Sequence, residues 1–493
     1  MLKIKYFFTS FDLNIVNIYK NKESTMKLNK IVNTELDLEI KGITSDSREV
    51  KQGYLFGSLN SDEYIKDAVA KGASVVIVSE SYDEKLPKDV VVIKSDNPAF
   101  TYAQAVAKYY GKVPNHLSAV TGTNGKTSVV DFVRQVLTKM GYSAASIGTL
   151  GLIKGNEDAK PSPNTTPNNV ALHKQLKQLA EEGCSYLVME TSSHGLHQYR
   201  VGGLTYNVAA FTNLTRDHLD YHKTFEEYLD AKLILFKQLL SADGTAVLNA
   251  DIDEYGKIAD VCRHRGQRVI SYGRRGEDIK LLSATPSSKG QCLEIEYFGQ
   301  PQTIEIAQVG EFQAMNVLCA LGMLAAITSL PDDVIRYIGD IKGAKGRLEH
   351  VADINGASVY IDYAHTPDAL ENALKALRPH TQGRLHVLFG CGGNRDSGKR
   401  PIMGQIAHEY ADVVYVTDDN PRFEEADDIR NEIIPGCPGA FNIADRSKAI
   451  KMAMSSLMPG DVLVLAGKGH ETGQYIKGEI IPFSDHEEVL KNI

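Results

Sequence analysis

The chain has 493 residues, 54 lysines and arginines against 62 aspartates and glutamates, and a formal net charge of −8. Its length predicts two to four domains, and a 43% share of hydrophobic residues is enough to build large buried cores. The negative charge argues against nucleic acid as a main partner, and no apolar run approaches the length of a membrane span. The six cysteines have neither pairing nor metal-ligand spacing, which is typical of free thiols in a reducing cytoplasm.

Residues 1–25 are expected to form an N-terminal extension outside the fold. They contain basic and aromatic residues but neither an unbroken apolar stretch nor a small-residue cleavage site, which argues against a signal peptide. A cleaner sequence begins at Met26, which we interpret as the working start of the protein. N-terminal sequencing of the natural protein tests this interpretation, and finding residues 1–25 intact would refute it.

Short apolar runs alternate with amphipathic stretches of helical spacing along the rest of the chain. This alternation predicts an α/β fold whose parallel sheets are covered by helices on both faces. The expected buried strands are Val75–Val78, Leu117–Val120, Tyr186–Met189, Val208–Phe211, Ala246–Leu248, Val359–Ile361, Leu385–Phe389, Val413–Val416 and Val462–Leu465. Domain boundaries are expected near Pro114 and between Lys345 and Gly346, so that the three domains span residues 26–114, 115–345 and 346–493.

Residues 118–128, Ser-Ala-Val-Thr-Gly-Thr-Asn-Gly-Lys-Thr-Ser, join a predicted strand to a helical pattern from Ser128 to Met140. Backbone N–H groups in such a turn, at a helix N-terminus, bind an anion. Lys126 can reach the terminal phosphates of a nucleotide, and the Thr127 hydroxyl can bind magnesium. The loop therefore predicts ATP or a close relative as a ligand. Val120 stands where the usual phosphate loop has glycine, so this loop is a shortened variant.

Polar clusters follow the predicted strands at the point where each strand ends. They span residues 190–195, 212–222, 362–365, 390–396, 417–422 and 466–471. Any one of them could be a solvated loop. Ligands of open parallel sheets bind outside the carboxyl ends of the strands, so that many clusters at that end predict an active site.

Three residues in or near these clusters are candidates for a cation site. Glu190 offers the carboxylate that magnesium prefers, and His218 offers a less usual imidazole ligand. Lys232 lies in a helical pattern among apolar neighbours, where the residues alone favour a side chain whose amine reaches water.

Together these motifs resemble the Mur ligases, ATP-dependent amide-forming enzymes of peptidoglycan synthesis, and in particular the members that add the third amino acid. The resemblance runs from about residue 42 to the end of the chain. It is carried by residues 44–48 (Thr-Ser-Asp-Ser-Arg), 122–127 (Gly-Thr-Asn-Gly-Lys-Thr), 164–167 (Asn-Thr-Thr-Pro), 190–195 (Glu-Thr-Ser-Ser-His-Gly), 213–220 (Asn-Leu-Thr-Arg-Asp-His-Leu-Asp), 231–232 (Ala-Lys), 249–251 (Asn-Ala-Asp), 346–349 (Gly-Arg-Leu-Glu), 362–367 (Asp-Tyr-Ala-His-Thr-Pro) and 467–471 (Gly-Lys-Gly-His-Glu).

The resemblance implies a role for each domain. Residues 26–114 would bind the UDP end of UDP-MurNAc-L-Ala-D-Glu, residues 115–345 would form a central P-loop-type parallel-sheet domain for ATP, and residues 346–493 a Rossmann-like domain for the amino acid. The nucleotide-sugar substrate would contact Ser45, Ser47, Thr165, Thr166, Ser192, Gln198 and Arg200. ATP would contact Gly122, Thr123, Asn124, Gly125, Lys126, Thr127, Ser128, Asn316, Arg347 and Asp362.

The resemblance also implies two magnesium ions. Thr127 and Glu190 would hold one, and His218 and Lys232 the other, with Lys232 carbamylated to N6-carboxylysine. Carbamylation turns a cation into a carboxylate-like oxygen ligand, which explains a lysine beside a cation site. Lys126, His218 and Lys232 are then the expected catalytic side chains. The implied reaction transfers the γ-phosphoryl group of ATP to a carboxylate, and the amine of an amino acid displaces phosphate from the acyl phosphate.

The segment Asp419-Asn420-Pro421-Arg422 resembles the family's recognition motif for meso-2,6-diaminopimelate. A guanidinium grips the second carboxylate of this amino acid bidentately and repels the ammonium of lysine. From the residues alone, a helix cap or an ion pair with Glu424 explains Arg422 equally well. Three further positions match the family's amino-acid ligands, namely Arg395, Gly467 and Glu471.

One position departs from the family pattern, because Gln313 stands where asparagine is usual, while Asn316 is kept. The longer amide offers the same donor and acceptor. The rival interpretations are an L-lysine-adding ligase, a folylpolyglutamate synthase and a non-catalytic nucleotide-binding protein. We expect a cytoplasmic monomer that binds neither nucleic acid nor membrane.

Overall fold

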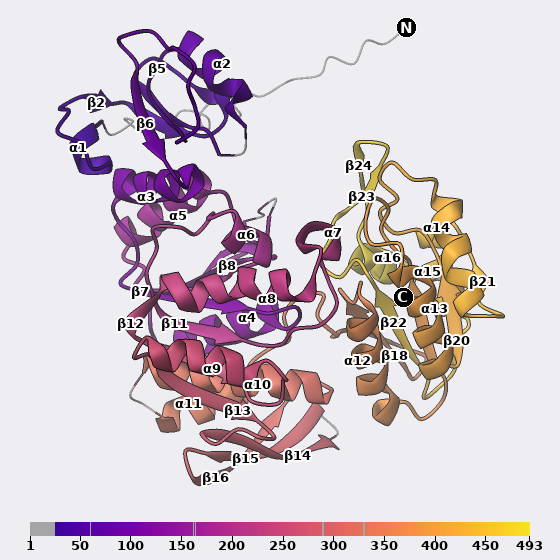
Figure 1. Ribbon diagram of the computed structural model, residues 1–493. Helices are drawn as coiled ribbons and strands as arrows, with labels where there is room; N and C mark the ends of the chain where they lie inside the picture. The colour runs from indigo at the N-terminus through magenta and orange to yellow at the C-terminus, as the bar shows by residue number, and fades with distance from the viewer. Residues whose placement is uncertain (1–24, 60, 161, 163, 288–289, 329–330) are drawn as a thin grey trace, which may run out of the picture. The chain divides into compact units, whose positions relative to one another are not determined.

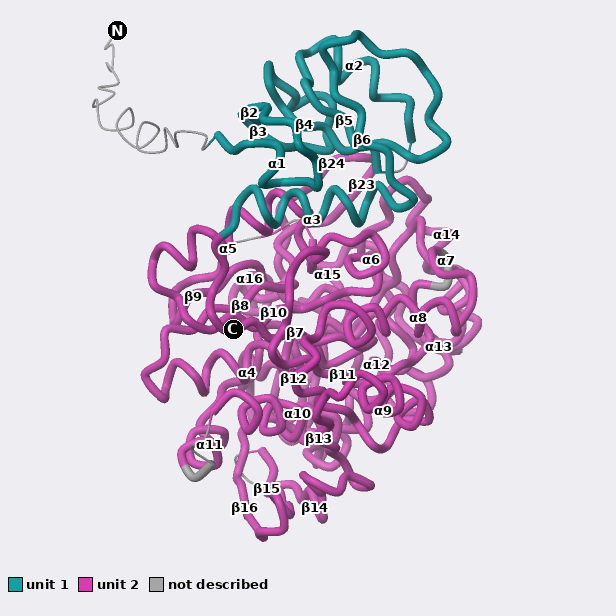
Figure 2. Tube along the Cα trace, turned by 60° about the vertical axis from the view of Figure 1, so that its left-hand side comes forward, with its two compact units in different colours: residues 1–111 teal, residues 112–493 magenta. Residues whose placement is uncertain are grey.

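The computed structural model describes residues 25–493 except 60, 161, 163, 288–289 and 329–330. The extension expected at residues 1–25 therefore lies outside the described residues except at its last position. The chain divides into two compact units, Met1–Gly111 and Lys112–Ile493 (Figure 2). No helix in the described ranges has both the length and the apolar character to cross a bilayer.

The first unit is built on a four-stranded parallel sheet in the order β3-β4-β5-β6. Its elements are β1 (Met26–Lys27), α1 (Leu28–Ile31), β2 (Glu39–Ile40), β3 (Gly42–Thr44), β4 (Tyr54–Gly57), α2 (Ile65–Ala70), β5 (Ala73–Ser79), β6 (Val91–Ser95) and α3 (Pro98–Tyr110), with short 3-10 turns at Ser47–Glu49 and Asp62–Tyr64. β5 is rich in β-branched residues and is buried on both faces, as a central parallel strand requires.

The second unit contains a ten-stranded sheet in the order β16-β15-β14-β13-β12-β11-β7-β10-β8-β9. Its strands are β7 (His116–Thr121), β8 (Ala144–Gly148), β9 (Gly151–Lys154), β10 (Tyr186–Glu190), β11 (Tyr206–Phe211), β12 (Leu240–Asn249), β13 (Arg268–Gly273), β14 (Ile279–Ser287), β15 (Gly290–Tyr297) and β16 (Gln300–Ile306). The helices between them are α4 (Lys126–Lys139), α5 (Asn169–Glu181), α6 (Ser193–His197), α7 (Leu219–His222), α8 (Phe225–Ile234), which continues as a π-helical turn at Leu235–Leu239, α9 (Tyr255–His264), α10 (Glu311–Ile327) and α11 (Pro331–Ile338).

The central sheet is parallel in its middle, as predicted, and antiparallel at both edges. The predicted strands pair in parallel in the middle, but β9 is antiparallel to β8, and β15 is antiparallel to β14 and β16. The edge strands alternate buried and exposed residues, because one face of an antiparallel edge meets water. These strands therefore lack the continuous apolar runs that mark the central strands.

Helices cover both faces of this sheet, as predicted. α4 and α10 pack on one face, where Val129 and Val317 join Val120 of β7 in a single core. α5, α8 and α9 pack on the other face, where Leu172 joins Leu117 of the same strand (Figure 1). Successive residues of β7 thus point to opposite faces, and both cores meet at the strand that leads into the phosphate loop.

The C-terminal part of the second unit has its own six-stranded sheet, in the order β17-β18-β22-β19-β20-β21. Its elements are β17 (Glu349–Ile354), β18 (Ala357–Asp362), α12 (Pro367–Leu377), β19 (Leu385–Phe389), α13 (Lys399–Tyr410), β20 (Val413–Val416), α14 (Ala426–Ile433), β21 (Phe441–Asn442), α15 (Arg446–Ser455), β22 (Val462–Ala466), the hairpin β23 (Gly473–Ile476) and β24 (Glu479–Pro482), and α16 (Asp485–Lys491), with 3-10 turns at Arg378–His380 and Ile434–Gly436.

The four strands predicted here form the parallel centre of that sheet, and β17 adds an antiparallel edge. Core residues of α12, α13 and α14 cover one face, and those of α15 and α16 cover the other. This two-faced α/β arrangement agrees with the Rossmann-like expectation. All the polar clusters predicted after strands therefore lie at the carboxyl ends of parallel strands.

Candidate active site

The phosphate loop has the backbone geometry that only glycine adopts without strain. Gly122 and Gly125 have φ values of +143° and +84°, and Gly125 caps the N-terminus of α4. A Cβ at Gly122 would lie 1.9 Å from Oγ1 of Thr212, and one at Gly125 would lie 2.3 Å from Oδ1 of Asn316. Both the conformation and the packing therefore require glycine at these two positions.

Two side chains directly after the neighbouring strand β11 hold the phosphate loop in place. The backbone N–H of Asn124 donates to Oδ1 of Asn213 at 2.8 Å, and the Thr212 hydroxyl donates to the Asn124 carbonyl at 2.6 Å. Lys126 folds back and donates to the carbonyl oxygens of Gly122 and Thr123, at 2.9 and 2.7 Å. Burial lowers the pKa of Lys126.

Glu190 ends β10 beside the loop and is buried. Its Oε2 accepts hydrogen bonds from the hydroxyls of Thr127 and Thr149, both at 3.1 Å, and its Oε1 accepts from the Thr149 N–H at 2.7 Å. Nη2 of Arg347, from the C-terminal part, donates to the same Thr127 hydroxyl at 2.9 Å. A carboxylate and hydroxyls thus meet at one point, which is the oxygen chemistry that magnesium requires. Sequence reasoning missed Thr149, which follows a strand without any recognisable motif.

Lys232 does not reach water, so the interpretation favoured by its sequence neighbours alone is wrong. Its side chain on α8 is 1% exposed, and its Nζ donates to the Gly122 carbonyl at 2.8 Å. Nζ also lies 4.3 Å from the ring centroid of Tyr228. Burial, with the charge of Lys126 nearby, lowers the pKa of Lys232 well below its ordinary value.

His218 occupies the N-terminal end of α7 in a left-handed conformation, with φ of +54°. Its Nε2 lies 3.4 Å from Oδ2 of Asp217, and burial lowers the pKa of His218 to about 4. The neutral imidazole is the form that binds a metal ion. Within the described residues, no three histidine, cysteine or acidic side chains form a metal cage of their own. The oxygen ligands of Glu190 and Thr127 therefore fit an ion that keeps phosphate or water ligands.

A cavity of about 310 Å³ opens over the loop. All the residues predicted to contact ATP except Gly122 line this cavity, and so do three of the four predicted metal ligands, Thr127 among them: Thr123, Asn124, Gly125, Lys126, Thr127, Ser128, Asn316, Arg347, Asp362, Glu190 and His218. The structure thus brings together residues that are more than two hundred positions apart in the chain.

The departure at Gln313 has a structural explanation. Its Oε1 accepts a hydrogen bond from Nδ2 of Asn316 at 3.0 Å, and its Nε2 donates to the Arg347 carbonyl at 3.4 Å. The Gln313 amide therefore orients Asn316, which lines the cavity, and connects α10 by a hydrogen bond to the segment that carries Arg347. Asp362 fixes the same segment, because its carboxylate accepts from the backbone N–H groups of Leu348 and Ala364. Burial raises the pKa of Asp362 to about 6.

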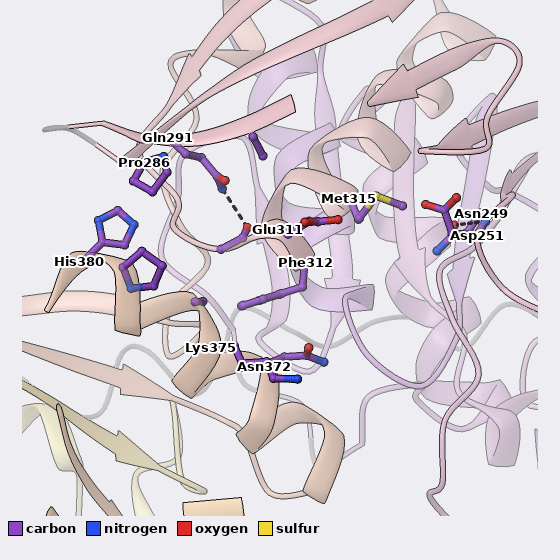
Figure 3. Close-up of a pocket in the computed structure, with 14 residues that line it drawn as sticks. Asn249, Asp251, Pro286, Gln291, Glu311, Phe312, Met315, Asn372, Lys375 and His380 are labelled. Atoms are coloured by element: carbon purple, nitrogen blue, oxygen red, sulfur yellow. Dashed lines mark hydrogen bonds between the residues drawn. The ribbon is translucent and has the colours of Figure 1, made fainter. Parts of the chain in front are cut away.

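A second cavity, of about 580 Å³, adjoins the first and shares Asn249, Phe312, Met315 and Asn372 with it (Figure 3). Its other walls come from β14 and β15, the start of α10, and α12. The Asn249–Asp251 motif forms one side, and Asp251 accepts hydrogen bonds from the backbone N–H groups of Arg274 and Arg275. The sequence did not indicate this cavity, because its walls come from edge strands that the apolar pattern had missed.

A third cavity, of about 430 Å³, collects the residues predicted to bind the other two substrates. Its lining includes Thr165, Ser192 and Arg200 from the central part and Arg395, Asp419, Asn420, Arg422, Gly467 and Glu471 from the C-terminal part. We call it the acceptor cavity. It shares Thr165, Ser192, Asp217 and His218 with the cavity over the phosphate loop, so the two adjoin beside the candidate metal ligands.

Three predicted substrate residues support the acceptor cavity without lining it. Thr166 is buried and accepts from the Ser192 N–H at 3.0 Å, and Oε1 of Gln198 accepts from Nε of Arg200, also at 3.0 Å. Pro421 is buried and stands between the lining residues Asn420 and Arg422 in the chain. Ser45 and Ser47 belong to the first compact unit, where Ser47 is buried and Ser45 is exposed.

Arg422 neither caps a helix nor pairs with Glu424. Its Nη1 donates to the Gly393 carbonyl at 2.9 Å, while Glu424 accepts from Nη2 of Arg400 at 2.8 Å. Burial and the charge of Arg395 lower the pKa of Arg422. Two guanidinium groups on one partly buried wall repel each other until an anion lies between them, so this wall suits a carboxylate.

The comparisons with known proteins agree with this geometry. Residues 120–324 match the family model of the Mur ligase middle domain, and residues 346–469 match the Mur ligase glutamate ligase domain. A UDP-N-acetylmuramoyl-L-alanyl-D-glutamate--2,6-diaminopimelate ligase of Bradyrhizobium diazoefficiens is 44% identical over 92% of this chain and 94% of its own. The enzyme of the same name from Chelativorans sp. is 46% identical over 92% and 94%.

The solved structures give the same result. One described as UDP-N-acetylmuramoyl-L-alanyl-D-glutamate--2,6-diaminopimelate ligase has a TM-score of 0.68 and 30% identity, and covers 95% of this chain and 99% of its own. A folylpolyglutamate synthase of Mycobacterium tuberculosis shares the fold, with a TM-score of 0.63 and 19% identity over 75% and 92%. The fold and site are thus those of an ATP-dependent amide ligase. The chain belongs to the Mur ligase family.

Proposed function

We infer that this Mur ligase is a MurE-type enzyme that joins meso-2,6-diaminopimelate to the D-glutamate of UDP-MurNAc-L-Ala-D-Glu in peptidoglycan synthesis, with ATP as the energy source. The observation that carries this function is the junction of a phosphate-loop cavity with an acceptor cavity walled by Arg395 and Arg422. Relatives with this activity in their names are 44–46% identical over nearly the whole chain.

The chemistry proposed for the site begins with the carboxylate of D-glutamate, whose oxide is too poor a leaving group for direct attack. Transfer of the γ-phosphoryl group makes an acyl phosphate, and the incoming amine then displaces inorganic phosphate. Lys126 would leave its two carbonyl acceptors and meet the phosphates instead. The second cavity provides room for the nucleoside end of ATP, next to Asn316 and Phe312.

Magnesium, when bound, would supply positive charge that offsets the charge of the transferred phosphoryl group. We propose that Thr127 and Glu190 hold one ion and that His218 and carbamylated Lys232 hold a second. The burial that lowers the pKa of Lys232 favours the neutral amine, which can add to carbon dioxide and release a proton. The resulting carbamate would place oxygen ligands beside Gly122, where an ammonium would repel a cation.

The choice of amino acid is proposed to depend on charge. Arg422, with Arg395, would bind the carboxylate that meso-2,6-diaminopimelate has and lysine lacks. Glu471 and Asn420 also line this cavity, and the carboxylate of Glu471 and the amide oxygen of Asn420 suit an ammonium. An L-lysine-adding ligase is therefore the weaker candidate.

Two sets of residues are proposed to contact the nucleotide-sugar substrate. Thr165, Ser192 and Arg200 would meet its peptide end, since they line the junction of the cavities. Thr166 and Gln198 would act by holding Ser192 and Arg200, and Ser45 and Ser47 would contact the UDP end. We also propose a monomer in the cytoplasm, where ATP is supplied, and light scattering of the purified protein tests the monomer.

Phosphate release from ATP tests the reaction. With UDP-MurNAc-L-Ala-D-Glu present, release should require meso-2,6-diaminopimelate and should be far slower with L-lysine. Release that depends on a folate in place of the nucleotide-sugar would identify a folylpolyglutamate synthase instead. Release with none of these acceptors would contradict the ligase assignment.

A further inference from the structure

Lys468 is a fully buried lysine directly behind the acceptor cavity. It follows β22, and its side chain is 0% exposed. Its Nζ donates to Oδ1 of Asn420 at 3.3 Å, to Oε2 of Glu471 at 3.0 Å and to the carbonyl oxygen of Gly473 at 2.7 Å. An ammonium has three N–H bonds, and here each of them has an acceptor. The side chain is therefore held in one orientation.

The hydrogen bonds of Lys468 also orient Asn420 and Glu471, which both line the cavity. Oδ1 of Asn420 accepts from Lys468 and from the Tyr475 N–H at 3.0 Å, while its Nδ2 donates to Oε2 of Glu471 at 2.9 Å. The amide cannot be reversed without placing N–H groups against two donors. Asn420 therefore has one permitted orientation, which Lys468 and the Tyr475 N–H define together.

The same contacts distinguish the two oxygens of Glu471. Oε2 accepts from both Lys468 and Asn420, whereas in the described part of the chain Oε1 meets Tyr363 Oη at a long 3.5 Å. The side chain of Glu471 is 25% exposed and lines the cavity. Oε1 is therefore the atom that can accept from a ligand, because Oε2 is already engaged.

We propose that Lys468 is a positioning residue that determines selectivity for the distal amine of the incoming amino acid. It engages Oε2 of Glu471 and so presents Oε1 to that ammonium, and it keeps the Asn420 amide from turning its N–H groups toward the same cation. The inference rests on the proposed function, because it takes meso-2,6-diaminopimelate as the ligand of this cavity. Lys468 touches no reacting atom, so its effect passes through Glu471 and Asn420.

A comparison of two acceptors tests the inference. 2-Aminopimelate keeps both carboxylates and the reacting amine of meso-2,6-diaminopimelate but lacks the distal amine. The wild type should favour meso-2,6-diaminopimelate in kcat/KM by about tenfold or more, the usual effect of a charged hydrogen bond. Glu471→Gln and Lys468→Met should each remove most of this preference. The double variant should lose little more than either single one, because both changes break the same contact.

The matched control is Arg134→Met, which removes another buried cation, paired with Asp131 on α4. This variant should keep the wild-type preference even if its Tm falls. A Lys468→Met variant that loses activity equally with both acceptors, with the preference intact, would show that Lys468 only stabilises the fold and would overturn the inference. If Lys468→Met does not fold, Lys468→Gln carries the same expectation.

The outcomes also separate the inference from the proposed function. If the wild type makes no product with meso-2,6-diaminopimelate, the proposed function is wrong. If the wild type and Lys468→Met share the preference while Glu471→Gln loses it, the proposed function stands and the role of Lys468 is wrong.

Discussion

The Nζ atom of Lys232 donates a 2.8 Å hydrogen bond to the carbonyl oxygen of Gly122, which also accepts from Nζ of Lys126 at 2.9 Å. Two amines that share one carbonyl acceptor in a buried site repel each other when both are protonated, which disfavours the charged form of each. Burial, together with the nearby charge of Lys126, lowers the pKa of Lys232. The hydrogen bond to Gly122 also places the amine that we propose to be carbamylated at the edge of the phosphate loop.

Replacing Lys232 by alanine should lower kcat by about a hundredfold or more, since it removes a group that would stabilise charge in the transition state. Short carboxylic acids added to Lys232→Ala should restore part of the activity by supplying the missing oxygen ligand. Steady-state phosphate release measures both effects. Full activity of the plain alanine variant would count against the carbamate.

Gly122→Ala should abolish nucleotide binding, because the new Cβ would collide with Thr212 and the backbone has a positive φ. Gly256→Ala is the matched control, since nothing lies within 4 Å of its Cβ position on α9. Calorimetric titration with ADP should show binding to the control and none to Gly122→Ala. Equal affinities would mean that the loop does not hold the phosphates.

Glu190→Gln should raise the magnesium concentration needed for half-maximal activity, because the amide keeps the hydrogen bonds with Thr127 and Thr149 in part but loses the charge. An increase of about tenfold corresponds to the loss of one charged contact. A magnesium titration of phosphate release measures it, and EDTA should stop the wild-type reaction. An unchanged magnesium requirement would mean that Glu190 is not a magnesium ligand.

The sequence predicted the central strands and the phosphate loop because their signals are local. Continuous apolar runs mark buried parallel strands, and the loop is contiguous from Gly122 to Ser128. The antiparallel edges, and with them the second cavity, could not be predicted in this way. Their strands alternate polar and apolar residues, and their pairing depends on neighbours far along the chain.

The role of a buried charged residue was equally hard to predict. Lys232 and Lys468 look alike in sequence, each a lysine beside apolar or glycine neighbours. Only the folded chain shows that each is buried and which carbonyl or carboxylate it meets. Motif spacing predicted many of the residues that line the two cavities, but not which predicted residues line a cavity and which hold the others in place.

Arg422→Ala should lower kcat/KM for meso-2,6-diaminopimelate by about thirtyfold or more, which corresponds to roughly 2 kcal/mol for a lost charged contact. The KM for ATP should stay within about twofold, since the residue is remote from the phosphate loop. Arg263→Ala, which removes an exposed arginine on α9, is the control. Unchanged efficiency in Arg422→Ala would refute its assigned role.

His173 on α5 should make stability depend on pH. It is buried, and burial lowers its pKa from 6.5 to about 4. Between these values the unfolded chain binds a proton that the folded chain does not, so stability is full above pH 6.5 and falls as the pH drops toward 4. At about pH 5 the loss should be about 2 kcal/mol relative to neutral pH. Urea unfolding of the wild type and His173→Leu measures it, and an equal pH dependence in both would contradict the assignment.

The product of a competition between two amino acids shows which one the enzyme adds. The wild type is given UDP-MurNAc-L-Ala-D-Glu, ATP, magnesium and equal concentrations of meso-2,6-diaminopimelate and L-lysine, and the nucleotide-linked product is identified by mass spectrometry. The meso-2,6-diaminopimelate tripeptide should predominate, because Arg422 and Arg395 would bind its second carboxylate. A product that is mainly the lysine tripeptide would contradict this prediction.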